Sequence, residues 1–411
     1  MAAELMGNYG IPPVTFVRGR GAELYDDQDK RYLDFLCGLA VTSLGHAHPA
    51  VTEAISEQAG VLTHVSNLFA NEPTAEVVNI LDRLVRWVGP PEQSPERGVD
   101  GVVVRYPSMV DEPGRVLFQN SGAEANEAAI KLVRKYQGRG RHVVVSALRS
   151  FHGRTLAALA ATGQPEKHEP FQPLPEGFHH VEWNDLDALE RVLSPAVGAV
   201  LLEPVQGEGG VNPAGPDYLR GVRQLCDERG ILLVMDEIQT GLARTGEWFG
   251  FQHAEIRPDV VTMAKALGNG YPVGAVWARR EVAAAFGPGD HGSTFAGQPL
   301  ALAVTRAVLK TMLAMDAPEV ARRKEATLRA HLGELPGIEQ VRGTGLLLGV
   351  ELDAEIRAGR TAPEIARECL RQGVVLNGVT PTALRLAPPF VVSDDQIAEG
   401  VAVLRRVLEA S

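Results

Sequence analysis

The feature that most constrains the fold is a series of short, continuously apolar segments that alternate with helix-forming segments between residues 114 and 279. Strong helix formers at 123–137 and, after an opening proline, at 216–230 separate some of these segments. Apolar strands joined by helices indicate an α/β fold with a mostly parallel sheet covered on both faces, which binds ligands at the carboxyl ends of its strands. We expect strands at 114–120, 142–147, 197–205, 230–237, 258–265 and 271–279.

The chain of 411 residues is long enough for two domains that each bury a core. After about residue 300, a long helix candidate at 299–314 is followed by short strands and helices, which is typical of a smaller α/β lobe. We therefore predict a large domain at 61–300 and a small domain at 301–411, with residues 1–60 packing against the small domain. Residues 89–113 are rich in proline, glycine and charge, which indicates an exposed insertion or long loop.

Composition narrows the partners that the chain can have. The net charge of −11 disfavours nucleic acid and anionic membranes, because both bind basic surfaces. No apolar run approaches the ~18 residues of a membrane helix, and the first residues do not resemble a signal peptide, so we expect a cytoplasmic protein. Cys37, Cys226 and Cys369 lie far apart, which argues against a disulfide framework or a zinc site. His46 and His48 lack a third ligand nearby in the sequence, so we expect turn residues there and no metal.

Two charged residues follow neighbouring strand candidates and suggest chemistry. Asp236 ends an apolar strand, where a buried carboxylate needs a cationic partner such as a protonated pyridine nitrogen, although a helix-capping acid is the simpler interpretation. Lys265 follows 29 residues later among apolar neighbours, in a chain with few lysines. Burial lowers the pKa of an amine and makes it nucleophilic enough to form a Schiff base. The alternative is a lysine whose stem packs while its ammonium group reaches water.

Two strand-to-helix turns offer binding groups. Ser121, Gly122 and Ala123 begin a helix, so their backbone N–H groups and a hydroxyl form a candidate phosphate site, or simply a capped helix. Further along, Phe151 is able to stack on a planar ring and Arg154 to pair with a carboxylate. The alternatives are a core aromatic residue and a surface arginine.

Acidic and basic residues complete the set. Glu203 and Glu208 lie near the end of one strand, and one of them is suited to pair with a substrate-binding arginine. Arg385 lies in an apolar run, where a buried arginine demands a carboxylate from the protein or from a ligand. The polar segment 292–299 carries hydroxyl groups that suit a phosphate. The order of these features at successive strand ends favours one common site.

These residues together resemble the class III aminotransferases, which depend on pyridoxal phosphate (PLP) and have fold type I. Within the class, the acetylornithine aminotransferases of arginine biosynthesis are the most similar. The resemblance implies a large domain with a mostly parallel sheet and a smaller lobe formed by the N- and C-terminal segments. It runs along nearly the whole chain and is carried by LDFLCGLAVTSLGHAHP, NSGAEANEAAIKLVRKY, FHGRTLAALAATGQ, EPVQGEGGV, MDEIQTGLARTGEWF and AKALGNGYPVGA.

The resemblance assigns cofactor roles to individual residues. It implies that Lys265 binds PLP covalently and then moves the proton at the substrate carbon, and that Asp236 keeps the pyridine nitrogen protonated. Gln239 would contact the ring hydroxyl, and Phe151 would stack on the ring. The turn at 121–123 would bind the phosphate.

Substrate and subunit contacts are also implied. Thr294 would reach the phosphate from a second subunit, because members of the family are homodimers. Arg154 and Arg385 would bind carboxylates, Ser293 would touch the substrate, and Glu208 would mask an arginine.

The implied reaction is a ping-pong transfer. N2-acetylornithine gives its δ-amine to the cofactor, and 2-oxoglutarate takes it and leaves as glutamate. Ornithine, succinylornithine, 4-aminobutyrate or an acyl-lysine remain alternative donors. A PLP aminomutase or decarboxylase, and a catalytically inactive binding protein, are alternatives of other classes.

Overall fold

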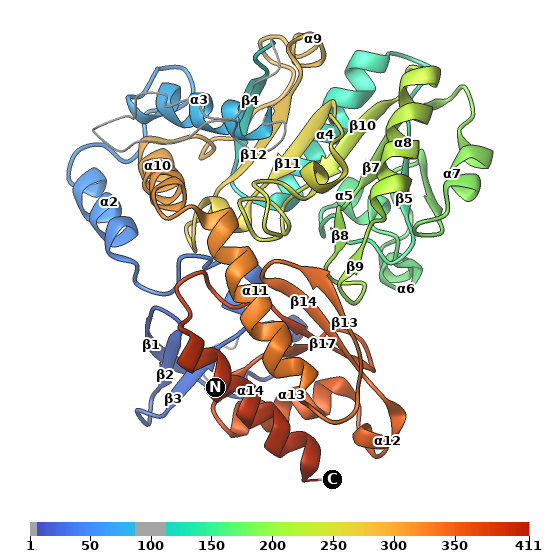
Figure 1. Ribbon diagram of the computed structural model, residues 1–411. Coiled ribbons are helices and arrows are strands. Elements are labelled where there is room, and N and C mark those ends of the chain that lie inside the picture. Colours follow the sequence, from blue (N-terminus) through green and yellow to red (C-terminus); the bar gives the residue numbers. More distant parts are fainter. Residues whose placement is uncertain (1–5, 87–111, 411) are drawn as a thin grey trace, which may run out of the picture.

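The computed structural model describes residues 6–86 and 112–410. It has two lobes, with the large sheet in the upper lobe of Figure 1 and most of the C-terminal part of the chain in the lower lobe. The predicted insertion at 89–113 lies almost entirely outside the described residues.

The upper lobe contains a seven-stranded sheet whose strands are parallel except β12, which runs antiparallel to both of its neighbours. All six predicted strands are present, so the predicted mostly parallel α/β sheet is confirmed. In sheet order the strands are β4 (Arg115–Gln119), β12 (Gly274–Ala278), β11 (Val260–Met263), β10 (Leu232–Asp236), β7 (Val197–Leu202), β5 (Val143–Ala147) and β6 (Phe178–Val181).

Both faces of this sheet are covered because alternate residues of its strands point to opposite sides. In β10, Leu232 and Val234 pack in one apolar cluster with residues of α4 (Gly122–Gln137). Leu233 and Met235 belong to the cluster on the other face, which includes residues of α8 (Pro216–Arg229). A strand buried on both sides therefore has no polar alternation, as the sequence pattern required.

The lower lobe combines the two ends of the chain. The N-terminal strand β3 pairs in parallel with the C-terminal strand β15, which joins β1, β2, β3 and β15 into one sheet, while β13, β14, β17 and β16 form another. The strands are β1 (Phe16–Arg20), β2 (Glu23–Asp26), β3 (Arg31–Asp34), β13 (Ile338–Thr344), β14 (Leu347–Leu352), β15 (Val374–Val375), β16 (Asn377–Gly378) and β17 (Ala383–Leu386). Helices α11 (Ala317–Gly333), α13 (Ala362–Arg371) and α14 (Asp394–Glu409) cover them (Figure 1).

We propose that the two lobes correspond to the domains predicted at 61–300 and 301–411, with residues 1–60 joined to the smaller one. Within 1–60, helix α2 (Pro49–Ala59) lies apart from the lower lobe, since it packs on α10 (Pro299–Ala314). The other elements are η1 (Gly7–Tyr9), α1 (Cys37–Ala40), α3 (Pro73–Val85), α5 (Leu156–Ala161), α6 (Pro165–His168), η3 (Glu169–Phe171), α7 (Leu186–Val192), β8 (Val205–Gln206), β9 (Asn212–Pro213), η4 (Gly250–Ala254), η5 (Lys265–Leu267), α9 (Arg280–Ala283) and α12 (Ala354–Arg357).

In residues 6–86 and 112–410, no helix is both long and apolar enough to cross a membrane. The same part of the chain holds no cluster of three or more His, Cys, Asp or Glu residues suited to a metal ion.

Candidate active site

A cavity of about 380 Å³ lies at the carboxyl ends of the strands β4, β5, β7, β10 and β11. Loops that follow these strands supply its walls, which is where an open α/β sheet binds ligands. The cavity brings together residues from distant parts of the sequence. Of the predicted site residues, those that line it are Ser121, Gly122, Ala123, Phe151, Arg154, Glu208, Asp236, Gln239 and Lys265.

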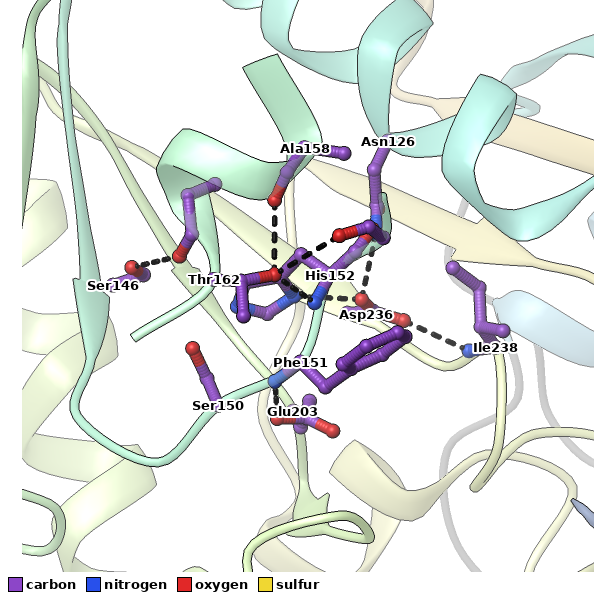
Figure 2. Close-up of polar contacts among 12 residues, drawn as sticks. Asn126, Ser146, Ser150, Phe151, His152, Ala158, Thr162, Glu203, Asp236 and Ile238 are labelled. Carbon is purple, nitrogen blue, oxygen red and sulfur yellow. Dashed lines mark hydrogen bonds and ion pairs between the residues drawn. The ribbon is translucent and has the colours of Figure 1, made fainter. Parts of the chain in front are cut away.

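Asp236 ends β10 and is held by contacts with Asn126, His152 and Ile238 (Figure 2). Its Oδ2 accepts a hydrogen bond from Nδ2 of Asn126 at 2.8 Å and lies 2.7 Å from Nδ1 of His152. Its Oδ1 accepts from the backbone N–H of Ile238 at 3.1 Å. Within the described residues no lysine or arginine forms an ion pair with this buried carboxylate. The side chain is thus fixed in orientation and suited to a cationic ligand atom in the cavity.

Lys265 lies at the start of η5, on the cavity wall, with a φ of 44°. Among the described residues its Nζ has no hydrogen-bond or ion-pair partner. Burial, and then the guanidinium of Arg385, lower the pKa of the amine to about 8, against the opposing charges of Glu208 and Asp236. A substantial fraction of the amine is therefore neutral near pH 8, as a nucleophile requires.

The turn before α4 combines a helix cap with a close contact. The Oγ of Ser121 accepts a hydrogen bond from the backbone N–H of Glu124 at 3.2 Å, so this hydroxyl caps the N-terminus of α4. A Cβ on Gly122 would lie 2.9 Å from the side chain of Ile238, which explains the need for glycine. The backbone N–H groups of Gly122 and Ala123 remain available to an anion at the helix N-terminus.

Arg385 in β17 is fully buried and binds Glu208. Its Nη1 lies 2.6 Å from Oε1 of Glu208 and 3.4 Å from Oε1 of Gln239, and its Nε donates to Asn377 at 3.2 Å. Its Nη2 is buried without a hydrogen-bond partner among the described residues. Burial alone would raise the pKa of Glu208, but the Arg385 guanidinium outweighs it and holds this pKa below its ordinary value. Glu208 is therefore a charged acid that occupies one edge of the arginine.

The remaining predicted residues lie at the margins. Arg154 is exposed at the cavity wall. Ser293 is outside the cavity lining, but its Oγ accepts a hydrogen bond at 2.8 Å from Nδ2 of Asn120, which does line the cavity. Thr294 is also outside the lining and exposed. Its predicted role requires a second subunit and stays a prediction.

Three residues around Asp236 were not assigned to the cofactor site in the sequence analysis, where Glu203 was considered only as a possible partner of an arginine. Glu203 is buried at the cavity wall, where its Oε2 accepts a hydrogen bond from the backbone N–H of Phe151 at 3.1 Å (Figure 2). Burial, and then the neighbouring Asp236, raise the pKa of Glu203 well above its ordinary value, which favours the protonated form of this acid. Asn126 and His152 were missed as well, because their signal is the contact with Asp236 and not a sequence pattern.

Fold and cavity together define a class of protein. The family model "Aminotransferase class-III" matches residues 6–408, and the chain belongs to the class III aminotransferases. Curated relatives include the acetylornithine aminotransferases of Corynebacterium efficiens, 43% identical over 98% of this chain and 94% of the relative, and of Methanopyrus kandleri, 43% identical over 99% and 97%.

Solved structures agree with this family. The ornithine aminotransferase of Toxoplasma gondii has a TM-score of 0.86 at 32% identity, covering 99% of this chain and 92% of that one. The N-acetylornithine aminotransferase of Stenotrophomonas maltophilia has a TM-score of 0.80 at 34% identity, covering 98% of both chains. Another structure of the Toxoplasma gondii enzyme is described with PLP at its active site.

The protein is a PLP-dependent aminotransferase, and its cavity residues fit this cofactor. The donor set matches each part of PLP: an unpartnered amine at Lys265, a helix N-terminus at Gly122, and a fixed carboxylate at Asp236. A Cβ on Gly207 would lie 1.7 Å from Oε1 of Gln239, so the backbone there leaves room only for that side chain. When bound, PLP acts as the electron sink of the reaction.

Proposed function

We propose that the chain transfers the δ-amine of N2-acetylornithine to 2-oxoglutarate, a step of arginine biosynthesis. The observation that carries this proposal is the buried Arg385, which the cavity-lining Glu208 covers at 2.6 Å, while the exposed Arg154 lines the same cavity. One arginine can thus be hidden while a terminal amine reacts, and uncovered when an oxo acid brings a carboxylate. The acetylornithine aminotransferases at 41–43% identity over nearly the full chain support the same substrate.

Each side chain of the cavity has a role in this proposal. Lys265 binds the cofactor, and its neutral Nζ then takes the proton from the substrate carbon and returns it in the second half of the reaction. Asp236 keeps the ring nitrogen protonated, and Phe151 and Gln239 orient the ring. The turn at 121–123 binds the phosphate.

We also propose a homodimer in which Thr294 reaches the phosphate site of the partner. The surface beside Thr294 is apolar and exposed, with Phe295 at 71% and Leu68 at 85% exposure. Nδ2 of Asn67 donates to the carbonyl of Ala296 at 3.0 Å, so these two segments adjoin. Exposed large side chains of this kind mark interfaces. Light scattering should give twice the monomer mass, and Phe295→Asp should weaken the dimer. A cytoplasmic location stays part of the proposal.

Turnover measurements test the substrate. With 2-oxoglutarate as acceptor, kcat/KM for N2-acetylornithine should exceed that for ornithine, succinylornithine, 4-aminobutyrate or an acetylated lysine. A reversed ranking would overturn this substrate and leave the family unchanged. Product formation without any oxo acid would instead indicate an aminomutase.

A further inference from the structure

Two cations flank the Phe151 ring at the edge of the active-site cavity. Cζ of Arg154 lies 5.6 Å from the ring centroid, and Nζ of Lys167, in helix α6, lies 5.7 Å from it. In the described part of the chain, neither side chain has a carboxylate within ion-pair distance. Lys167 is half-buried and Arg154 is exposed, and an unpaired charge that is partly buried favours a counter-ion, so this pair of cations is suited to an anion.

Two acids act on Lys167 without forming an ion pair with it. Glu166 and Glu208 raise its pKa at longer range, and Oε1 of Glu208 is engaged by Nη1 of Arg385 at 2.6 Å. Nζ of Lys167 donates to Oε1 of Gln164, which leaves donors of the ammonium group unused. Burial lowers the pKa of Lys167, and the positive charge of Arg154 lowers it further. Arg154 is the charge that acts most strongly on Lys167, and a carboxylate bound beside both cations would offset this repulsion.

Lys167 directly follows three residues that line a second cavity next to the active site. Glu208 lines both the active-site cavity and a second cavity of about 390 Å³. Gln164, Pro165 and Glu166, which directly precede Lys167 in the chain, line this second cavity. A substrate that reacts at Lys265 and extends toward the second cavity would bring its far end beside Lys167 and Arg154.

We propose that Lys167 is a specificity-determining residue that, together with Arg154, binds the substrate carboxylate farther from the reacting atoms. This rests on the proposed function, in which both the acylated amino acid and the dicarboxylic oxo acid carry such a carboxylate. Cζ of Arg154 and Nζ of Lys167 lie 5.6 and 5.7 Å from the centroid of the Phe151 ring. A carboxylate bound at the edge of this ring would therefore lie within a Debye length, about 8–10 Å, of both charges. Lys167 thereby favours substrates with a distal carboxylate over shorter or uncharged ones.

Direct binding of glutarate to the PLP-loaded protein tests this proposal without catalysis. Lys167→Met removes the charge at similar size and should weaken glutarate about tenfold, the effect of ~1.4 kcal/mol from one lost charge-assisted hydrogen bond. Lys167→Arg restores the cation and should bind glutarate close to the wild type. Lys30→Met, which removes an equal charge in the lower lobe, is the matched control, and isothermal titration calorimetry gives each dissociation constant.

Kinetics separate recognition from a structural effect. For 2-oxoglutarate, Lys167→Met should raise KM with little change in kcat, whereas 2-oxopentanoate, which ends in a methyl group, should be used as by the wild type. Unchanged glutarate binding, or equal losses with both oxo acids, would overturn the role of Lys167. If the wild type failed to use N2-acetylornithine, the proposed function would fall, but the glutarate measurement would still decide for or against Lys167.

Discussion

Uncovering Arg385 should redirect the enzyme toward glutamate. Glu208→Gln keeps a hydrogen-bond acceptor near Nη1 of Arg385 but removes the charge that now lies 2.6 Å away. A hydrogen bond to a charged partner contributes about 1.5–3 kcal/mol and a neutral one about 0.5–1.5 kcal/mol. The side chain at position 208 competes with a substrate carboxylate for Arg385, and its hydrogen bond is therefore weakened by ~1.4 kcal/mol, which corresponds to about tenfold in affinity. Gln239 and Asn377 still hold the guanidinium in place.

Stopped-flow absorbance of bound PLP measures both half-reactions of this variant. We expect kcat/KM for glutamate to rise about tenfold relative to kcat/KM for N2-acetylornithine, because only glutamate places a carboxylate beside its reacting amine. Glu182→Gln removes an exposed acid of the second cavity and is the matched control. A glutamate half-reaction that is unchanged, or that falls together with the other one, would refute the masking role of Glu208.

Three further predictions concern the cofactor. The rate at which the PLP-free protein binds PLP covalently should rise with pH up to about 8, because the neutral amine of Lys265 reacts; a pH-independent rate would contradict the lowered pKa. Glu203→Gln should retain PLP affinity and Glu203→Leu should lose it, because the raised pKa favours the neutral form of this acid. A dialysis assay in which Glu203→Gln releases PLP as readily as Glu203→Leu would show that the charge of Glu203 is needed. Asn126→Ala removes one of the two side-chain partners of Oδ2 of Asp236 and should weaken PLP binding by about 1–3 kcal/mol; an equilibrium titration that finds unchanged PLP affinity would show that this contact is dispensable.

Much of the fold followed from residue patterns within the chain. Continuous apolar strands and intervening helices indicated a parallel sheet, and the structure has one. The exception is β12, which runs antiparallel to β11. Only the stretch between Met263 and Gly274 separates these strands, and a parallel connection needs a dozen or more residues, usually as a helix. The short spacing between the two strands therefore already indicated an antiparallel connection.

The site was predictable where its residues follow strand ends and less so where contacts are distant in sequence. Asp236 and Lys265 stand directly after β10 and β11, so the parallel sheet brings them together. The pairing of Arg385 with Glu208 joins residues 177 positions apart in different lobes, and residue patterns alone left Glu203 and Glu208 as alternatives, while the family resemblance implied Glu208. The protonation of Glu203 depends on burial and on Asp236, which sequence patterns do not report.

The central claim is that Lys265 is the residue that binds PLP, and chemical trapping tests it most directly. Borohydride reduction of the PLP-loaded protein, followed by mass spectrometry of its peptides, identifies the modified lysine. We predict that the peptide containing Lys265 carries the reduced cofactor and that Lys265→Ala retains none covalently. Cofactor trapped on another lysine, or on the Lys265→Ala protein, would contradict the assignment of this active site.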